Sequence, residues 1–160
     1  MSRSPFFYVE RFNKHTMKYE LQHPIVWNDD RTEQELATLF PYNGHHELFS
    51  IVENSSVYDF PRMYGVHLGL PDNVSSDIQK EYQTCCEEFK LPPRWFTYAD
   101  MYIYCLEHPM VKDSYEEDEF LIPNPVKRLK DRVDAFLNVM CEWGDWKDDY
   151  SLIRIVYWIG

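Results

Sequence analysis

Glycine and basic residues are both scarce in this chain, and each shortage argues against a class of function. There are 5 glycines in 160 residues, too few and too scattered to form a glycine-rich phosphate loop or a Gly-x-Ser-x-Gly nucleophile turn. Lysine and arginine number 16 against 27 aspartates and glutamates, which leaves a net charge of −11. A sequence-independent grip on DNA or RNA needs a dense basic surface, so nucleic acid is the least expected partner.

Long apolar runs are also lacking. No stretch approaches the roughly 18 apolar residues of a membrane helix, and residues 1–9 do not show the basic, apolar and small-residue succession of a signal peptide. We therefore expect a soluble, cytoplasmic protein without membrane contact.

The cysteines show no metal-binding spacing. Cys85, Cys86, Cys105 and Cys141 include no C-x-x-C pair and match no zinc module. The sequence predicts free thiols, no metal site and no cofactor.

Aromatic residues, in contrast, are abundant. They make up 17% of the chain, with 10 Phe, 12 Tyr and 5 Trp. Aromatic side chains bury much area each, which favours a core built from rings, while Tyr and Trp also stack on flat ligands and anchor interfaces. The hydrophobic share of 44% and charged share of 27% are those of a globular protein. The length predicts one domain, residues 1–160.

Alternating apolar residues predict strands at both ends of the chain. Period-2 patterns cover 7–12 and 17–21 with a hairpin turn between them, and 24–27 follows as a third short strand. Residues 63–68 suggest an irregular strand. The final segment, 152–159, is β-branched and aromatic with one charge, which is typical of a central strand.

Helical spacing and capping residues predict helices between these ends. A short helix is expected over 33–40, and a second one is expected to be capped by Asn43. A third is capped by Ser75 or Asn73 and has apolar positions from Ile78 to Phe89. A largely buried helix over 98–107 has Thr97 and Asp100 as a capping box, and the last helix is opened by Asn124 and Pro125. The segment 111–123 is expected as a surface loop. Together these elements predict an α+β fold: an antiparallel or mixed sheet with the N- and C-terminal strands, and helices packed on one face.

Four segments occur in the order of a known family. They are Tyr42-Asn43 shortly before Leu48-Phe49, then Gly-Leu-Pro-Asp-Asn-Val-Ser at 69–75, Trp-Phe-Thr at 95–97, and Ile-Arg-Ile-Val-Tyr-Trp at 153–158. Together they resemble a family of small acidic proteins encoded by bacteriophages and prophages, which has no assigned activity. The resemblance implies an accessory protein that acts in the cytoplasm of a host cell, and it supplies no catalytic residue.

Enzymatic motifs are incomplete. His45-His46-Glu47 resembles the start of the zinc-protease motif, but the second histidine would stand at position 50, which is Ser50. If the amides of residues 44–46 open a helix, they would form an anion site. A cysteine hydrolase that pairs a Cys with one of the 6 His has no local signature. We therefore expect a binding protein and not an enzyme.

Two surfaces are candidates for binding. The first would hold a nucleotide-like small molecule, because arginine binds phosphate and aromatic rings stack on bases; its residues are Tyr42, Asn43, His45, Arg62, Arg94 and Trp95. The second is acidic and would meet a basic groove of a host protein; it comprises 107–119 with Asp145, Asp148 and Asp149.

The leading hypothesis is a non-enzymatic, phage-type binding protein that antagonises a host defence process by sequestering a nucleotide-like small molecule. The first alternative is an acidic inhibitor that blocks a basic groove of a host nuclease or effector. The second alternative is a Cys/His hydrolase. The sequence leaves the ligand, the host target and the oligomeric state open.

Overall fold

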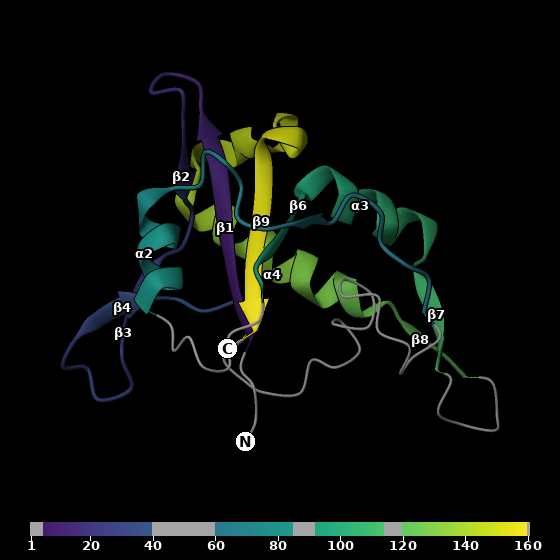
Figure 1. Ribbon diagram of the computed structural model, residues 1–160. Helices are drawn as coiled ribbons and strands as arrows, with labels where there is room; N and C mark the ends of the chain where they lie inside the picture. Colours follow the sequence, from purple (N-terminus) through teal and green to yellow (C-terminus); the bar gives the residue numbers. More distant parts are fainter. Residues whose placement is uncertain (1–4, 40–59, 85–91, 114–119, 160) are drawn as a thin grey trace.

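The computed structural model describes residues 5–39, 60–84, 92–113 and 120–159. At its centre is a five-stranded sheet with the order β2-β1-β9-β6-β5 (Figure 1). Its strands are β1 (Pro5–Asn13), β2 (Lys18–Leu21), β5 (His67–Leu68), β6 (Arg94–Thr97) and β9 (Ile153–Ile159). Every pair in it is antiparallel. The predicted α+β fold with N- and C-terminal strands in one sheet is confirmed.

Strand β9 lies in the middle of this sheet, as its composition predicts. It pairs with β1 on one side and β6 on the other, with Tyr157 opposite both Phe7 and Arg94. All its residues from Ile153 to Trp158 are buried. A strand covered on both faces needs apolar side chains at nearly every position, and this requirement accounts for the run of β-branched and aromatic residues at 153–158.

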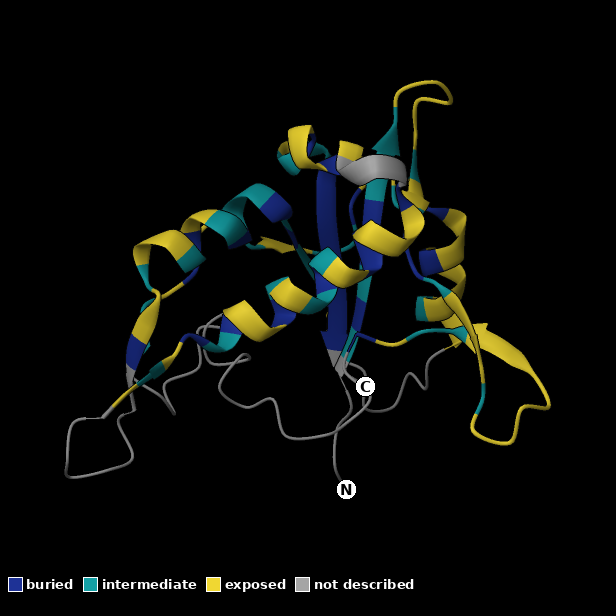
Figure 2. Ribbon diagram, turned by 180° about the vertical axis from the view of Figure 1, so that it is seen from behind, coloured by how far each residue is buried: buried dark blue, intermediate teal, exposed yellow. Residues whose placement is uncertain are grey.

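Helices α3 (Tyr98–Glu107) and α4 (Pro125–Met140) cover one face of the sheet (Figure 2). The buried side of α4 includes Val126, Leu129, Val133 and Leu137, which pack in one core with Val9, Phe96 and Ile155 of the sheet. Both predicted caps are present. Thr97 and Asp100 form a reciprocal capping box, and the Asn124 side chain accepts a hydrogen bond of 2.7 Å from the backbone N–H of Val126.

Helix α2 (Ser76–Thr84) lies on the other face of the sheet (Figure 1). Its Ile78 is fully buried against Val156 and Trp158 of β9. The predicted cap Ser75 accepts a hydrogen bond of 3.3 Å from the backbone N–H of Ile78. Two of the three described α-helices, α3 and α4, thus cover one face of the sheet, and α2 covers part of the other face.

Two hairpins lie outside the central sheet. Strand β3 (Ile25–Trp27) pairs with β4 (Gln34–Leu36), and β7 (Met110–Asp113) pairs with β8 (Phe120–Pro123). The predictions of a helix over 33–40 and a loop over 111–123 are therefore wrong. Short strands of this kind are stabilised by cross-strand pairs, which the periodicity of one segment cannot reveal.

The other predicted elements agree with the structure only in part. Helix 98–107 has the expected bounds but is less buried than expected, since Ile103 and Leu106 are exposed. The expected strand over 63–68 is limited to His67–Leu68. The helix expected after Asn43 lies outside the described residues. None of the described helices has the length and apolar character needed to cross a membrane.

Candidate functional site

The structure places three of the six predicted ligand residues. Arg62 is exposed in the segment before β5, while Arg94 and Trp95 follow one another on β6. Successive residues of a strand point to opposite faces of the sheet, so Arg94 and Trp95 are not brought together. The other three, Tyr42, Asn43 and His45, lie outside the described residues.

Trp95 packs on the α2 side of the sheet. Its ring stacks on His67, with centroids 4.2 Å apart, and lies 5.7 Å from the guanidinium carbon of Arg154. These contacts join β5, β6 and β9. Binding of a nucleotide-like molecule by the predicted set stays a prediction.

A buried ionic network, formed by Glu10, Arg154, Asn73 and Ser75, ties α2 to the sheet. Arg154 Nε donates a hydrogen bond of 2.6 Å to Glu10 Oε1, and the backbone N–H of Ser75 donates one of 2.6 Å to Glu10 Oε2. The two Nη atoms of Arg154 donate to Asn73 Oδ1 and to its backbone oxygen, at 2.7 and 3.0 Å. The Tyr19 ring lies over the guanidinium group. Because both carboxylate oxygens and all three guanidinium nitrogens have partners, we assign this network to structure.

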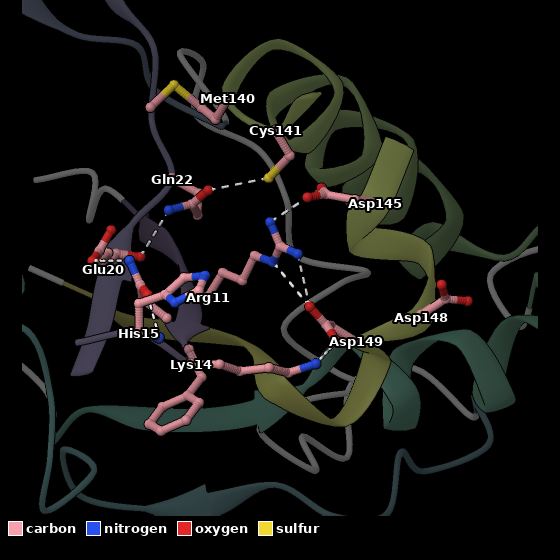
Figure 3. A pocket seen from close by; sticks show the side chains of 12 residues that line it. Arg11, Lys14, His15, Glu20, Gln22, Met140, Cys141, Asp145, Asp148 and Asp149 are labelled. Atoms are coloured by element: carbon pink, nitrogen blue, oxygen red, sulfur yellow. Dashed lines mark hydrogen bonds and ion pairs between the residues drawn. The ribbon is translucent and has the colours of Figure 1, made fainter. Parts of the chain in front are cut away.

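An open ionic network, formed by Arg11, Lys14, Asp145 and Asp149, lines a polar cleft of about 470 Å³ (Figure 3). The cleft lies between the turn after β1 and the 3-10 helix η2 (Glu142–Asp148). Arg11 donates through Nη2 to Asp149 at 2.7 Å and through Nη1 to Asp145 at 3.2 Å. Lys14 Nζ donates to the second oxygen of Asp149 at 3.0 Å.

The pairing of Asp149 controls the electrostatics of the polar cleft. Burial raises the pKa of its carboxyl, but the hydrogen bonds from Arg11 and Lys14 outweigh burial and hold that pKa below its ordinary value. Asp149 is therefore a carboxylate at neutral pH, neutralised by two cations. The cleft accordingly offers less free negative charge than its sequence suggests.

The predicted acidic surface is divided in the structure. Glu107 to Asp113 precede the start of α4, whereas Asp145, Asp148 and Asp149 follow its end. A helix of 16 residues is about 24 Å long at 1.5 Å per residue. These two acidic groups therefore lie near opposite ends of α4; residues 114–119 lie outside the described part of the chain.

The described cysteines have the properties of structural thiols. Cys141 donates through Sγ to Gln22 Oε1 at 3.3 Å, and burial raises its pKa. Burial also raises the pKa of Cys105, to about 11. A nucleophilic cysteine needs a lowered pKa, so neither residue supports the hydrolase alternative; Cys85 and Cys86 lie outside the described residues. Within the described ranges, no group of three or more His, Cys, Asp or Glu is placed to hold a metal ion.

The hairpin of β3 and β4, residues 25–36 and hereafter the Trp27 hairpin, projects from the body of the protein (Figures 1 and 2). The exposed fractions of Ile25, Val26 and Trp27 are 66%, 41% and 58%. The sequence predicted a strand here but gave no sign that three consecutive apolar residues would face solvent. An ordered apolar group of this kind is typical of a contact surface for another molecule.

Hydrogen bonds within the turn fix the shape of the Trp27 hairpin. The Asn28 side chain accepts from the backbone N–H of Thr32 at 2.9 Å and donates to the Thr32 hydroxyl at 3.0 Å. The backbone N–H of Asn28 also donates to the Glu33 carbonyl at 2.9 Å. The exposed apolar residues are thus presented on an ordered element, which lowers the entropy cost of binding.

His23 attaches the base of this hairpin to the sheet. Its ring accepts a hydrogen bond through Nε2 from the backbone N–H of Val9 at 2.9 Å, so Nδ1 carries the proton and donates to the Ala37 carbonyl at 2.8 Å. The ring is 3% exposed, and burial lowers its pKa to about 4. His23 is therefore a neutral connector between β1 and the segment that follows β4.

Comparison of the chain with known protein families, with curated proteins and with solved structures finds no match.

Proposed function

We propose that this chain binds another protein, and that the Trp27 hairpin enters a positively charged groove on that partner. The sequence already allowed an acidic inhibitor as an alternative; here the contact is made by a different element. The observation that carries it is the exposure of Ile25, Val26 and Trp27 on a projecting, ordered hairpin. Aromatic residues at the centre of an interface commonly contribute most of the binding energy.

One face of the Trp27 hairpin is suited to an apolar contact. Because side chains alternate along a strand, Ile25 and Trp27 share one face, and the register places Leu36 and Gln34 opposite them. This face is mostly apolar. It supplies the centre of the contact, from which water is excluded.

The charged residues of the hairpin indicate that the binding surface of the partner is positively charged. Residues 25–36 contain four carboxylates, Asp29, Asp30, Glu33 and Glu35, and one arginine, Arg31. All five are exposed, and the whole chain has a net charge of −11. Complementary charge steers association and selects the partner, which favours a basic groove with an apolar floor.

The resemblance to bacteriophage proteins suggests where such a partner would be found. A phage-encoded protein of this kind would meet proteins of the host cell, and a host nuclease or effector has a basic groove for nucleic acid. Occupation of that groove by the Trp27 hairpin would exclude the nucleic acid. The proposed outcome is inhibition without bond cleavage.

Affinity capture with matched variants tests the proposal. We expect the wild-type protein to retain a basic partner that is released by salt, and both Trp27→Ala and the double variant Asp29→Lys/Asp30→Lys to retain at least about tenfold less. Met17→Ala is the control, because Met17 is 70% exposed in a different hairpin. The retained protein is then purified and titrated by calorimetry, with a 1:1 complex expected.

Three outcomes would contradict the proposal. They are equal retention by wild type and Trp27→Ala, equal loss with Met17→Ala, or no retained partner for the wild-type chain. Mass spectrometry of material released on heating addresses the nucleotide hypothesis separately. That hypothesis has less support, because Arg94 and Trp95 point to opposite faces of the sheet.

A further inference from the structure

A second cavity lies between α3, α4 and the base of the β7–β8 hairpin. It is near the start of α4, whereas the polar cleft is near the end of that helix. Its volume is about 450 Å³, within the range of pockets that hold small organic molecules. We call it the apolar cavity. It is lined by Tyr102, Cys105, Leu106, Pro109, Met110, Pro123, Asn124, Lys127, Lys130 and Asp131.

Most of the wall of this cavity is hydrocarbon that remains in contact with water. Leu106 is 64% exposed and Met110 is 45% exposed, although both belong to elements whose other sides are packed. Tyr102 is half-buried beside them. An apolar group placed against these side chains would remove their exposed area from water, which is the main driving force for binding of small apolar molecules.

Lysines outnumber acidic residues in the lining, although each lysine is paired with a carboxylate, Lys127 with Asp131 and Lys130 with Asp134. Two lysines and one aspartate line the cavity, whereas the whole chain has a net charge of −11. Lys130 donates to Asp134 at 2.9 Å and lies 5.6 Å from the centre of the Tyr102 ring. Its ammonium group is thereby held in place.

Lys127 is the cation that is able to change partner. Its ammonium group lies 3.3 Å from Asp131, and the two side chains are 61% and 57% exposed. Exposed pairs of this kind contribute little to stability. Lys127 can therefore turn to an anionic group at the mouth of the cavity at small cost.

We propose that the apolar cavity binds a small organic molecule with an apolar body and one anionic group. The body packs against Tyr102, Leu106 and Met110, and the anionic group pairs with Lys127. Neither the Trp27 hairpin nor a protein partner is needed for this site. The experiment must distinguish this small molecule from another occupant of the cavity, an apolar side chain of a partner protein.

Fluorescence titration with anilinonaphthalene sulfonate tests the proposal, because this dye combines an aromatic body with one sulfonate. We expect one saturable site per chain. Lys127→Glu should weaken binding about tenfold through loss of a charge-assisted hydrogen bond. Leu106→Gln should weaken it several-fold through loss of apolar contact. N-phenylnaphthylamine, which has the same rings without the sulfonate, should bind more weakly and should be insensitive to Lys127→Glu.

Matched controls locate the dye. Lys80→Glu makes the same charge change at an exposed position of α2, and Trp27→Ala removes another exposed ring; both should leave Kd unchanged. Circular dichroism should show an unaltered fold in every variant, since Lys127 and Leu106 are exposed.

Several results would overturn the proposal. One is binding without saturation, and another is a Kd unchanged by both Lys127→Glu and Leu106→Gln. Loss of binding only in Trp27→Ala would assign the dye to the hairpin. If Leu106→Gln abolished retention of a protein partner while dye binding stayed at wild-type strength, the cavity would belong to a protein interface instead.

Discussion

Two ionic networks begin at adjacent residues of β1 and lead to opposite faces of the sheet. Glu10 meets Arg154 under α2, where the two side chains are 0% and 4% exposed. Arg11 meets Asp149 and Asp145 at the polar cleft, where the side chains of Arg11, Asp149 and Asp145 are 20%, 8% and 59% exposed. The same kind of pair thus occurs once with both partners buried and once with a buried carboxylate whose cations, Arg11 and Lys14, reach solvent. We therefore expect the difference in solvation, more than the number of hydrogen bonds, to determine how much each network contributes to the free energy of unfolding.

The buried network is the more sensitive of the two to loss of one partner. Arg154→Met leaves the Glu10 carboxylate buried without its cation, and we expect a loss of about 3–5 kcal/mol in the free energy of unfolding. Urea denaturation measures this loss. If the variant fails to fold, Asn73→Ala should give a smaller loss of the same sign. A change below about 1 kcal/mol for Arg154→Met would place this network in the same energetic class as the open one.

His23 extends the comparison to a buried group that is kept neutral. Its folded pKa of about 4 lies below the ordinary value of about 6.5, so the unfolded chain binds the proton more tightly. The stability that depends on neutral His23 is full above about pH 6.5 and is lost as the pH falls toward 4. We expect a loss of roughly 3 kcal/mol over this window.

Urea denaturation at a series of pH values, for wild type and His23→Gln, measures that contribution. The variant cannot titrate at this position, so its stability should fall less between pH 6.5 and 4. Parallel curves for the two proteins would show that His23 is not the group responsible.

The open network should show the smallest effect and the largest response to salt. Asp149→Asn weakens its contacts with Arg11 and Lys14. The Asp149 side chain is 8% exposed, but Lys14 is 63% exposed and asparagine keeps one oxygen acceptor, so we expect a loss of about 1 kcal/mol in dilute buffer. Since screening is strong at about 1 M salt, the difference from wild type should shrink there. Because the pKa of Asp149 is lowered, its contribution is present above the ordinary pKa and is lost as the pH falls through the folded value. Urea denaturation of wild type and Asp149→Asn at two salt concentrations checks the salt effect. If the difference in the free energy of unfolding did not change with salt, the Arg11–Asp149 pair would be shielded from solvent.

Local signals predicted those parts of the fold that depend on one segment. The Thr97–Asp100 box and the Asn124 cap fix helix starts through hydrogen bonds within a few residues. The apolar composition of 153–158 predicted a central strand, because both faces of such a strand are covered. Strand β4 was mistaken for a helix because its structure depends on β3 and on the hydrogen bond between His23 and Ala37.

The candidate binding surfaces depended much more on tertiary structure. Ile25, Val26 and Trp27 have the composition of a core strand, and their exposure follows from the position of the hairpin outside the sheet. The lining of the apolar cavity comes from α3, α4 and a hairpin that was predicted as a loop. No pattern within one segment could bring Leu106 and Lys127 to the same cavity.

The sequence by itself determined the α+β class, the central position of the last strand and the caps of α3 and α4, because these depend on alternation and on contacts between near neighbours; it left the cap of α2 open between Asn73 and Ser75. It also determined that Glu10 and Arg11 point to opposite faces of β1, since successive strand residues do so. Only the tertiary structure decided which of these two charges is buried. That choice depends on α2 covering the face of Glu10, and α2 is held there by Asn73, Ser75 and Arg154, which are distant from β1 in the chain.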